Sequence, residues 1–168
     1  MTADNPAKQF YWDYCCSSFG IDHDGVRAEY LALGGGDPVL EMKWRREFVE
    51  YWLAKISTDD EEPLRRLSIV YGAEAIPTLL DMNDYGDDYM KFWFAFTLYD
   101  LAEANIPNDQ KKQARAKAKA LWEEIVVSPR FITPKHRELV TSQMLEGFHA
   151  KTPEEYVRNY ALSKLNRS

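Results

Sequence analysis

The segment that decides the fold begins at Asp37 and reads DPVLEMKWRREFVEYWL, residues 37–53. A short polar residue before proline starts helices well, because its side chain accepts a bond from an orphan backbone N–H and proline lacks only a donor that would have stayed unpaired. Apolar side chains then recur every three or four residues, at Leu40, Trp44, Phe48, Tyr51 and Trp52. This spacing predicts an amphipathic helix of roughly five turns, ending near Ser57.

The same polar–proline pair opens three more segments, at Asn5-Pro6, Thr133-Pro134 and Thr152-Pro153. We expect the first to give a helix as far as Phe19, stopped by Gly20, and the second to give one helix through Phe148. Within the segment 87–105, residues 90–99 are apolar on every side except at Lys91, and they predict a buried central helix in which Trp93 is deeply buried.

These elements predict an all-α protein of about seven to nine helices in irregular orthogonal or bundle-like packing. With 168 residues, the chain is expected to form a single compact helical domain over residues 1–168. No internal repeat at a solenoid period and no low-complexity linker divides it.

Charge and composition exclude several classes of protein. The net charge of −6 argues against nucleic-acid binding, which needs lysine and arginine to replace counterions. No apolar run approaches the ~20 residues of a membrane span, and no signal peptide opens the chain. The only cysteines, Cys15 and Cys16, are adjacent and cannot close an ordinary disulfide loop, so we expect a reducing cytoplasm.

No catalytic, cofactor or metal motif is complete, and we therefore expect no cofactor and no bound metal. Glu146-x-x-His149 has the spacing of a di-iron ligand pair, but the second such pair that the site needs is missing. The loop that begins at Asp81 starts like an EF-hand and lacks its closing glutamate, because Phe92 stands at the twelfth position.

Charge patterning is the most suggestive remaining signal. The stretch 81–88 carries four aspartates that predict a partner-binding surface: Asp81, Asp84, Asp87 and Asp88. A basic helix follows, in which Lys111, Arg115 and Lys119 share one stripe. The alternative is that these acids only cap the next helix and pair with basic neighbours.

The favoured function is a protein–protein interaction module of the bacterial cytoplasm, an acidic adaptor, inhibitor or immunity-type protein that binds a basic partner. Two alternatives stay open, and the question of enzyme activity stays open with them. One is a small enzyme or metal-binding protein whose site is assembled from Asp22, His23, Asp24, Glu146 and His149. The other is a ligand-binding helical domain with an aromatic pocket near Phe10, Trp12, Trp44 and Trp93.

Overall fold

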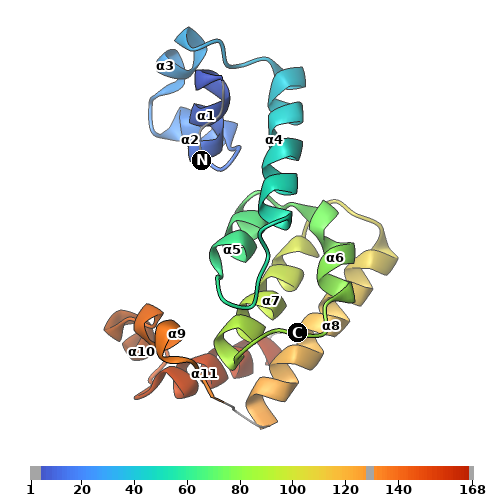
Figure 1. The fold of residues 1–168 in the computed structure, drawn as a ribbon, viewed down its shortest axis with the longest axis vertical. Helices are drawn as coiled ribbons and strands as arrows, with labels where there is room; N and C mark the ends of the chain where they lie inside the picture. The colour runs from blue at the N-terminus through green and yellow to red at the C-terminus, as the bar shows by residue number, and fades with distance from the viewer. Residues whose placement is uncertain (1–4, 128–130, 167–168) are drawn as a thin grey trace. The chain divides into compact units, whose positions relative to one another are not determined.

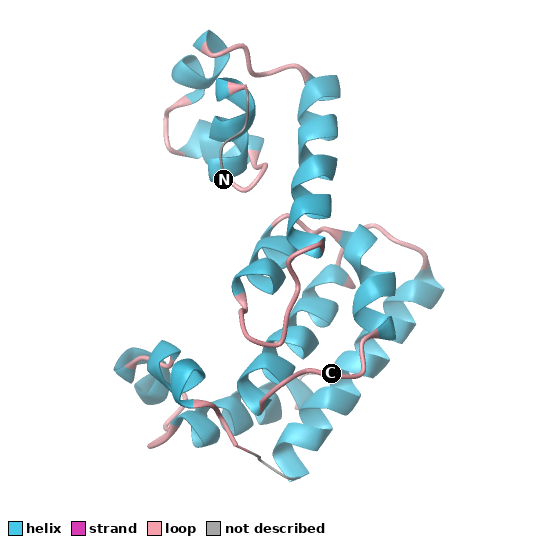
Figure 2. Cartoon of the chain, viewed as in Figure 1, coloured by secondary structure: helices cyan, strands magenta, loops and turns pink. Residues whose placement is uncertain are grey.

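A computed structural model of the chain describes residues 5–127 and 131–166. In these residues the protein is all-α, as predicted, with eleven α-helices and one 3-10 helix and no strand (Figure 2). The helices are more numerous than the seven to nine expected, because two predicted helices are each broken in two. No helix in the described ranges is long and apolar enough to cross a membrane.

Contacts within the chain define two compact units, residues 1–55 and 56–168. Whether these two units form the single domain expected over residues 1–168 stays a prediction. The first unit contains α1 (Pro6–Asp13), α2 (Ser18–His23), α3 (Arg27–Ala32) and α4 (Pro38–Leu53) (Figure 1). The second unit contains α5 (Glu62–Ile69), η1 (Ala73–Ala75), α6 (Ile76–Asp81), α7 (Asp88–Leu101), α8 (Asn108–Val127), α9 (Pro134–Leu139), α10 (Ser142–Gly147) and α11 (Pro153–Leu165).

All four polar–proline pairs start helices in the way the sequence predicts. The side chains of Asn5, Asp37, Thr133 and Thr152 each accept a bond from a backbone N–H in the first turn that follows. Asp87 does the same for α7, where its carboxylate accepts the Met90 N–H. These caps fix where the helices begin, and they leave the carboxylate of Asp87 at the base of the central helix.

Three helix ends place a residue other than glycine in the left-handed backbone region: Cys15 (φ 49°), Tyr71 (φ 48°) and His149 (φ 50°). At each end the N–H one residue further on bonds to the carbonyl five residues before it, which is the Schellman pattern in which glycine is usual. Gly34, with φ 88°, ends α3 with the same pattern of bonds.

The end at Cys15 corrects the first predicted helix. Since α1 ends at Asp13, Gly20 lies inside α2 and does not stop a helix that runs to Phe19. The predicted helix from Thr133 through Phe148 is also broken, because Val140 is extended and Thr141 caps a new helix by accepting the Met144 N–H.

The core of the second unit forms around α7, which packs against α8, α5, α11 and α6. Met90, Phe94 and Leu98 of this helix have no exposed surface, so the prediction of a buried central helix is confirmed. The prediction for Trp93 is wrong. Its side chain is only partly buried, on the side of α7 where Tyr89 and Phe96 pack against it, and Trp122 of α8 is the fully buried tryptophan.

Candidate functional site

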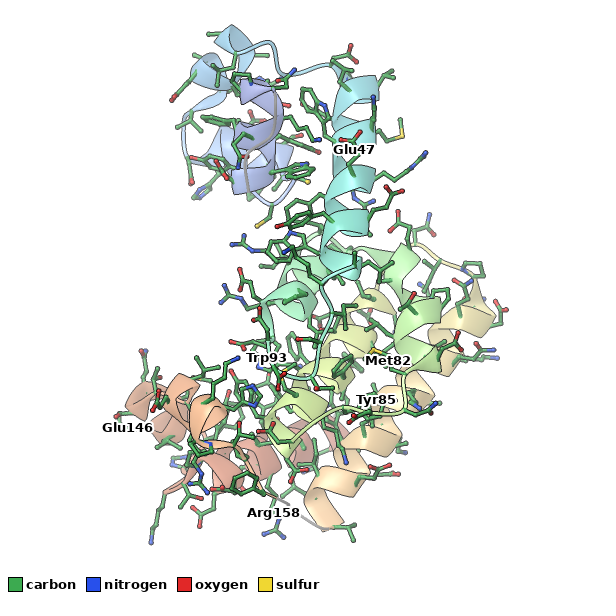
Figure 3. All side chains as sticks on the ribbon, viewed as in Figure 1. Glu47, Met82, Tyr85, Trp93, Glu146 and Arg158 are labelled. Atoms are coloured by element: carbon green, nitrogen blue, oxygen red, sulfur yellow. The ribbon has the colours of Figure 1, made fainter. Side chains whose placement is uncertain are left out.

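The acidic stretch 81–88 spans the end of α6, the loop 82–87 and the first residue of α7, and Met82 and Tyr85 of this loop are labelled in Figure 3. Gly86 has a φ of +68°, and a Cβ added there would lie 2.7 Å from the Thr58 carbonyl oxygen. The loop therefore passes directly against the backbone before α5. This contact brings a second acidic run, residues 59–62, beside the first.

His136 connects the two loops. Its Nδ1 lies 2.7 Å from Asp87 Oδ2, and its Nε2 lies 3.2 Å from the carbonyl oxygen of Asp59. Both side chains of the ion pair are buried, with 2% of His136 and 5% of Asp87 exposed. The ring of Tyr89 stacks on the imidazole with 5.2 Å between centroids. A buried ion pair thus fastens residue 59 to the start of α7.

The carboxylate of Asp87 is held in its charged form by hydrogen bonds. Burial raises its pKa, but N–H bonds from Thr133 and Met90 and the bond to His136 outweigh this effect, and the net pKa is lowered. Both ring nitrogens of His136 are engaged, Nδ1 with the Asp87 carboxylate and Nε2 with the Asp59 carbonyl oxygen. Since Nε2 is engaged with Asp59, the ring offers no free nitrogen to act as a general base, and the pair is structural in this arrangement.

The structure separates the four predicted partner-binding aspartates into two groups. Asp81 and Asp84 are exposed, whereas Asp87 is engaged with His136 and Asp88 is buried, with 4% exposure, in the first turn of α7. Asp84 also accepts the Gly86 N–H at 3.0 Å. Their role in binding a partner stays a prediction, but Asp87 also has the capping role that the sequence offered as the alternative.

Sequence reasoning missed two exposed acids that join this surface, Asp59 and Asp60, because an acidic run such as residues 59–62 is also typical of a helix start. Neither of them forms an ion pair with any residue that the structure describes, and the same is true of Asp81 and Asp84. The structure therefore gathers, from two loops, four exposed carboxylates that have no ion pair within the described part of the chain. We call these four residues, Asp59, Asp60, Asp81 and Asp84, and the backbone that carries them the double acidic loop.

Two hollows flank the double acidic loop, and Gly86 lines both. The first, which we call the carboxylate hollow, has a volume of about 360 Å³ and is lined by Asp59, Asp87, Asp88 and His136 together with Thr58, Gly86, Phe131 and Thr133. Three of these side chains are carboxylates. The phenyl ring of Phe131 at this hollow is 63% exposed.

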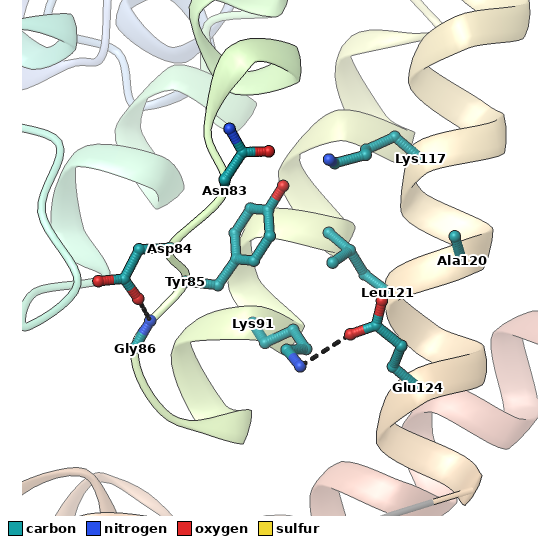
Figure 4. Close-up of a pocket in the computed structure, with 9 residues that line it drawn as sticks. All are labelled: Asn83, Asp84, Tyr85, Gly86, Lys91, Lys117, Ala120, Leu121 and Glu124. Carbon is teal, nitrogen blue, oxygen red and sulfur yellow. Dashed lines mark hydrogen bonds and ion pairs between the residues drawn. The ribbon is translucent and has the colours of Figure 1, made fainter.

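The second, the lysine hollow, has a volume of about 390 Å³ and lies between the loop and α8 (Figure 4). Two lysines line it, Lys91 of α7 and Lys117 of α8, with Glu124 also on α8. Lys117 belongs to the basic segment of α8, so the acidic loop 82–87 and the basic helix line the same hollow.

The residues of the alternative metal or catalytic site fall in both units. In the first unit Asp22 pairs with Arg27 at 2.7 Å, and His23 contacts Asp24 at 3.1 Å. In the second unit Glu146 and His149 are exposed at the end of α10 (Figure 3), where His149 has the left-handed backbone of a helix end. Among the described residues no group of three or more histidine, cysteine or acidic side chains could hold a metal ion.

The residues of the alternative aromatic pocket are also accounted for by packing. In the first unit the Nε1 of Trp12 donates to the Trp44 carbonyl at 2.8 Å, and both rings are buried. The ring of Phe10 stacks on Tyr30. Trp93 belongs to the second unit, so these four residues include parts of two separate cores.

The chain was compared with known protein families, curated proteins and solved structures. No family model, no curated protein and no solved structure matches the chain. A function must therefore be inferred from its own residues.

Proposed function

We propose that the protein is an interaction module that binds a basic partner protein through the double acidic loop. The observation that carries this proposal is a set of four exposed carboxylates that form no ion pair with any described residue: Asp59, Asp60, Asp81 and Asp84. Exposed charges of one sign attract a partner of the opposite sign and accelerate its association, most strongly at low salt.

The carboxylate hollow gives this surface a place for a side chain. A lysine or arginine of the partner would lie beside Asp59, with its aliphatic stem against the exposed side chain of Phe131. The Asp87–His136 pair supports the surface from beneath, because it fastens one acidic loop to the other. A rigid surface binds with a smaller loss of conformational entropy than two independent loops.

An adaptor, an inhibitor and an immunity-type protein are the forms of this proposal that suit a small acidic chain. The bacterial cytoplasm is the proposed location, on the ground of the adjacent cysteines. The structure adds support against a nucleophilic role for one of them, because burial raises the pKa of the Cys16 thiol to about 12.

The test is a quantitative capture experiment with charge-reversal variants. The wild-type chain, Asp81→Lys/Asp84→Lys and a control, Glu29→Lys/Glu50→Lys, are immobilised and exposed to a bacterial lysate. The control residues are exposed acids of the first unit, so both double variants change the net charge equally. We expect a basic protein that is captured by the wild type and the control and lost from Asp81→Lys/Asp84→Lys.

The purified partner then gives the decisive measurement, its association rate at several salt concentrations. We expect slower association and a weaker salt dependence for Asp81→Lys/Asp84→Lys, with an unchanged free energy of unfolding. Equal capture by the two charge variants, or equal loss from both, would show that no specific acidic surface is involved.

A further inference from the structure

The lysine hollow has a chemistry opposite to that of the double acidic loop. Asn83, Tyr85, Lys91, Lys117 and Glu124 present the polar groups around it, and Figure 4 shows side chains from the loop, α7 and α8 pointing into the space between them. Leu121 and Ala120 supply an apolar side. Its volume of about 390 Å³ falls within the usual range for small-molecule pockets.

Lys91 is the informative residue, because a lysine is seldom so buried. Only 8% of its surface is exposed, and its Nζ lies 2.9 Å from Glu124 Oε2. An ammonium group has three donors, and no other described residue accepts a bond from this one. Buried donors of a charged group are costly when unpaired, so the hollow has a place for a further acceptor.

Lys117 supplies a second ammonium group on the facing helix. Its Nζ lies 5.4 Å from the centre of the Tyr85 ring, which holds a cation by its negative face, and it forms no ion pair with a described residue. The Tyr85 hydroxyl donates to the Met82 carbonyl, which fixes the ring in place.

The balance of charge in the hollow is positive. Asp84 lines it only by its backbone side, since its carboxylate bonds to the Gly86 N–H and points away in Figure 4. Two ammonium groups therefore face one carboxylate, that of Glu124, whose side chain is 59% exposed. The net charge of these three groups is +1, which a ligand with one negative charge would balance.

We propose that the lysine hollow binds a small polar ligand through an oxyanion group, a carboxylate or a phosphate, that is attracted by the ammonium groups of Lys91 and Lys117. The Nδ2 of Asn83 donates to the Asp81 carbonyl, which leaves its Oδ1 to accept a hydroxyl or amine of the same ligand. Leu121 and Ala120 take the apolar part of the ligand. The hollow shares Asp84 and Gly86 with the double acidic loop, but binding of a small ligand there does not need a macromolecular partner.

The test uses the two simplest oxyanions as probes. The ¹⁵N-labelled protein is titrated with sodium phosphate and, separately, with sodium acetate, while sodium chloride keeps the ionic strength constant. We expect saturable shifts of the amide signals of Asn83, Gly86 and Lys117 with at least one probe. Tighter saturation by phosphate would assign a phosphoryl group to the ligand, and tighter saturation by acetate would assign a carboxylate.

Three variants make the outcome specific. Lys117→Gln should weaken binding roughly tenfold, the effect of losing one charge-assisted hydrogen bond. Glu124→Gln should tighten it, because the competing acceptor on Lys91 loses its charge. The control Lys119→Gln, whose lysine pairs with Glu123 and does not line the hollow, should bind as the wild type does. Shifts that never saturate with either probe, or that weaken equally in Lys117→Gln and Lys119→Gln, would overturn the proposal.

Discussion

Asp87 and His136 are 49 positions apart in the sequence, yet their side chains form one of the most buried ion pairs among the described residues. The pair lies where three segments meet: the loop before α5, the start of α7 and the start of α9. Through it, the cap of the central helix is also the anchor of the neighbouring acidic loop.

The Asp87→Asn substitution should destabilise the fold more than its small change in shape suggests. Asparagine can still accept the Met90 N–H as a helix cap, but its Nδ2 replaces the oxygen that accepts from the Thr133 N–H and faces His136. We expect the free energy of unfolding at pH 7 to fall by about 3–5 kcal/mol, the usual result of leaving one buried partner uncompensated. Urea unfolding measures it, with the exposed Asp84→Asn as a control expected within about 0.5 kcal/mol of the wild type.

The same pair predicts how stability depends on acid. Because the folded pKa of Asp87 is lowered, its contribution is fully present above the unfolded pKa of about 3.9 and is lost as pH falls through the folded pKa. The gap in unfolding free energy between the wild type and Asp87→Asn should therefore shrink as the pH falls below about pH 4. A gap that fails to shrink in this range would contradict a charged Asp87 in the folded protein.

Cys16 should react slowly with alkylating agents in the native protein. Burial raises its pKa to about 12, so at pH 8 its thiolate fraction is lower by roughly a thousandfold than that of a free cysteine. The Cys15→Ser variant leaves Cys16 as the only thiol, and mass spectrometry follows its reaction with iodoacetamide. Unfolding in urea should restore the ordinary rate; equal rates with and without urea would show that the thiol is accessible.

The His149→Gly substitution should stabilise the protein. His149 holds a φ of 50°, which costs a residue with a Cβ roughly 1–2 kcal/mol and glycine almost nothing. Glycine also raises the conformational entropy of the unfolded chain, which offsets part of this gain. We therefore expect the free energy of unfolding to rise by about 0.5–1 kcal/mol. Gly34→Ala is the matched opposite change, since an added Cβ there meets nothing within 4 Å and only the backbone conformation is tested.

Two tryptophans should respond differently to truncation. Trp122 has no exposed surface, so Trp122→Ala is expected to cost about 3–5 kcal/mol. Trp93 is partly buried, and Trp93→Ala should cost clearly less. Equal losses in thermal or urea unfolding would mean that Trp93 is as much a part of the core as the sequence predicts.

Where helices begin could be predicted from the sequence, because the signal is local. The caps at Asn5, Asp37, Thr133 and Thr152 need only a side chain and the next three residues. Where helices end was harder to predict. Cys15 is not a residue type that marks a left-handed helix end, and neither is Cys16, which follows it with a φ of 56°.

The candidate site could be predicted only in part, for a related reason. The charge density of the stretch 81–88 is visible in the sequence, and so is the acidic run at 59–62. That the two lie side by side depends on His136, and nothing near His136 in the sequence indicates a partner 49 residues away. In the sequence, Lys91 is only a single charge within an apolar run. Its contact with Glu124 could not be predicted, because Glu124 lies on another helix.

The close approach of Gly86 to Thr58 limits how this chain can diverge. A side chain at position 86 would meet the Thr58 backbone and would also have to adopt a φ of +68°, so two independent costs oppose every replacement. Asp81 and Asp84 carry no comparable constraint, since other acids would preserve their charge. In descendants that keep both loops, position 86 should therefore remain glycine, whereas aspartate and glutamate should exchange freely around it.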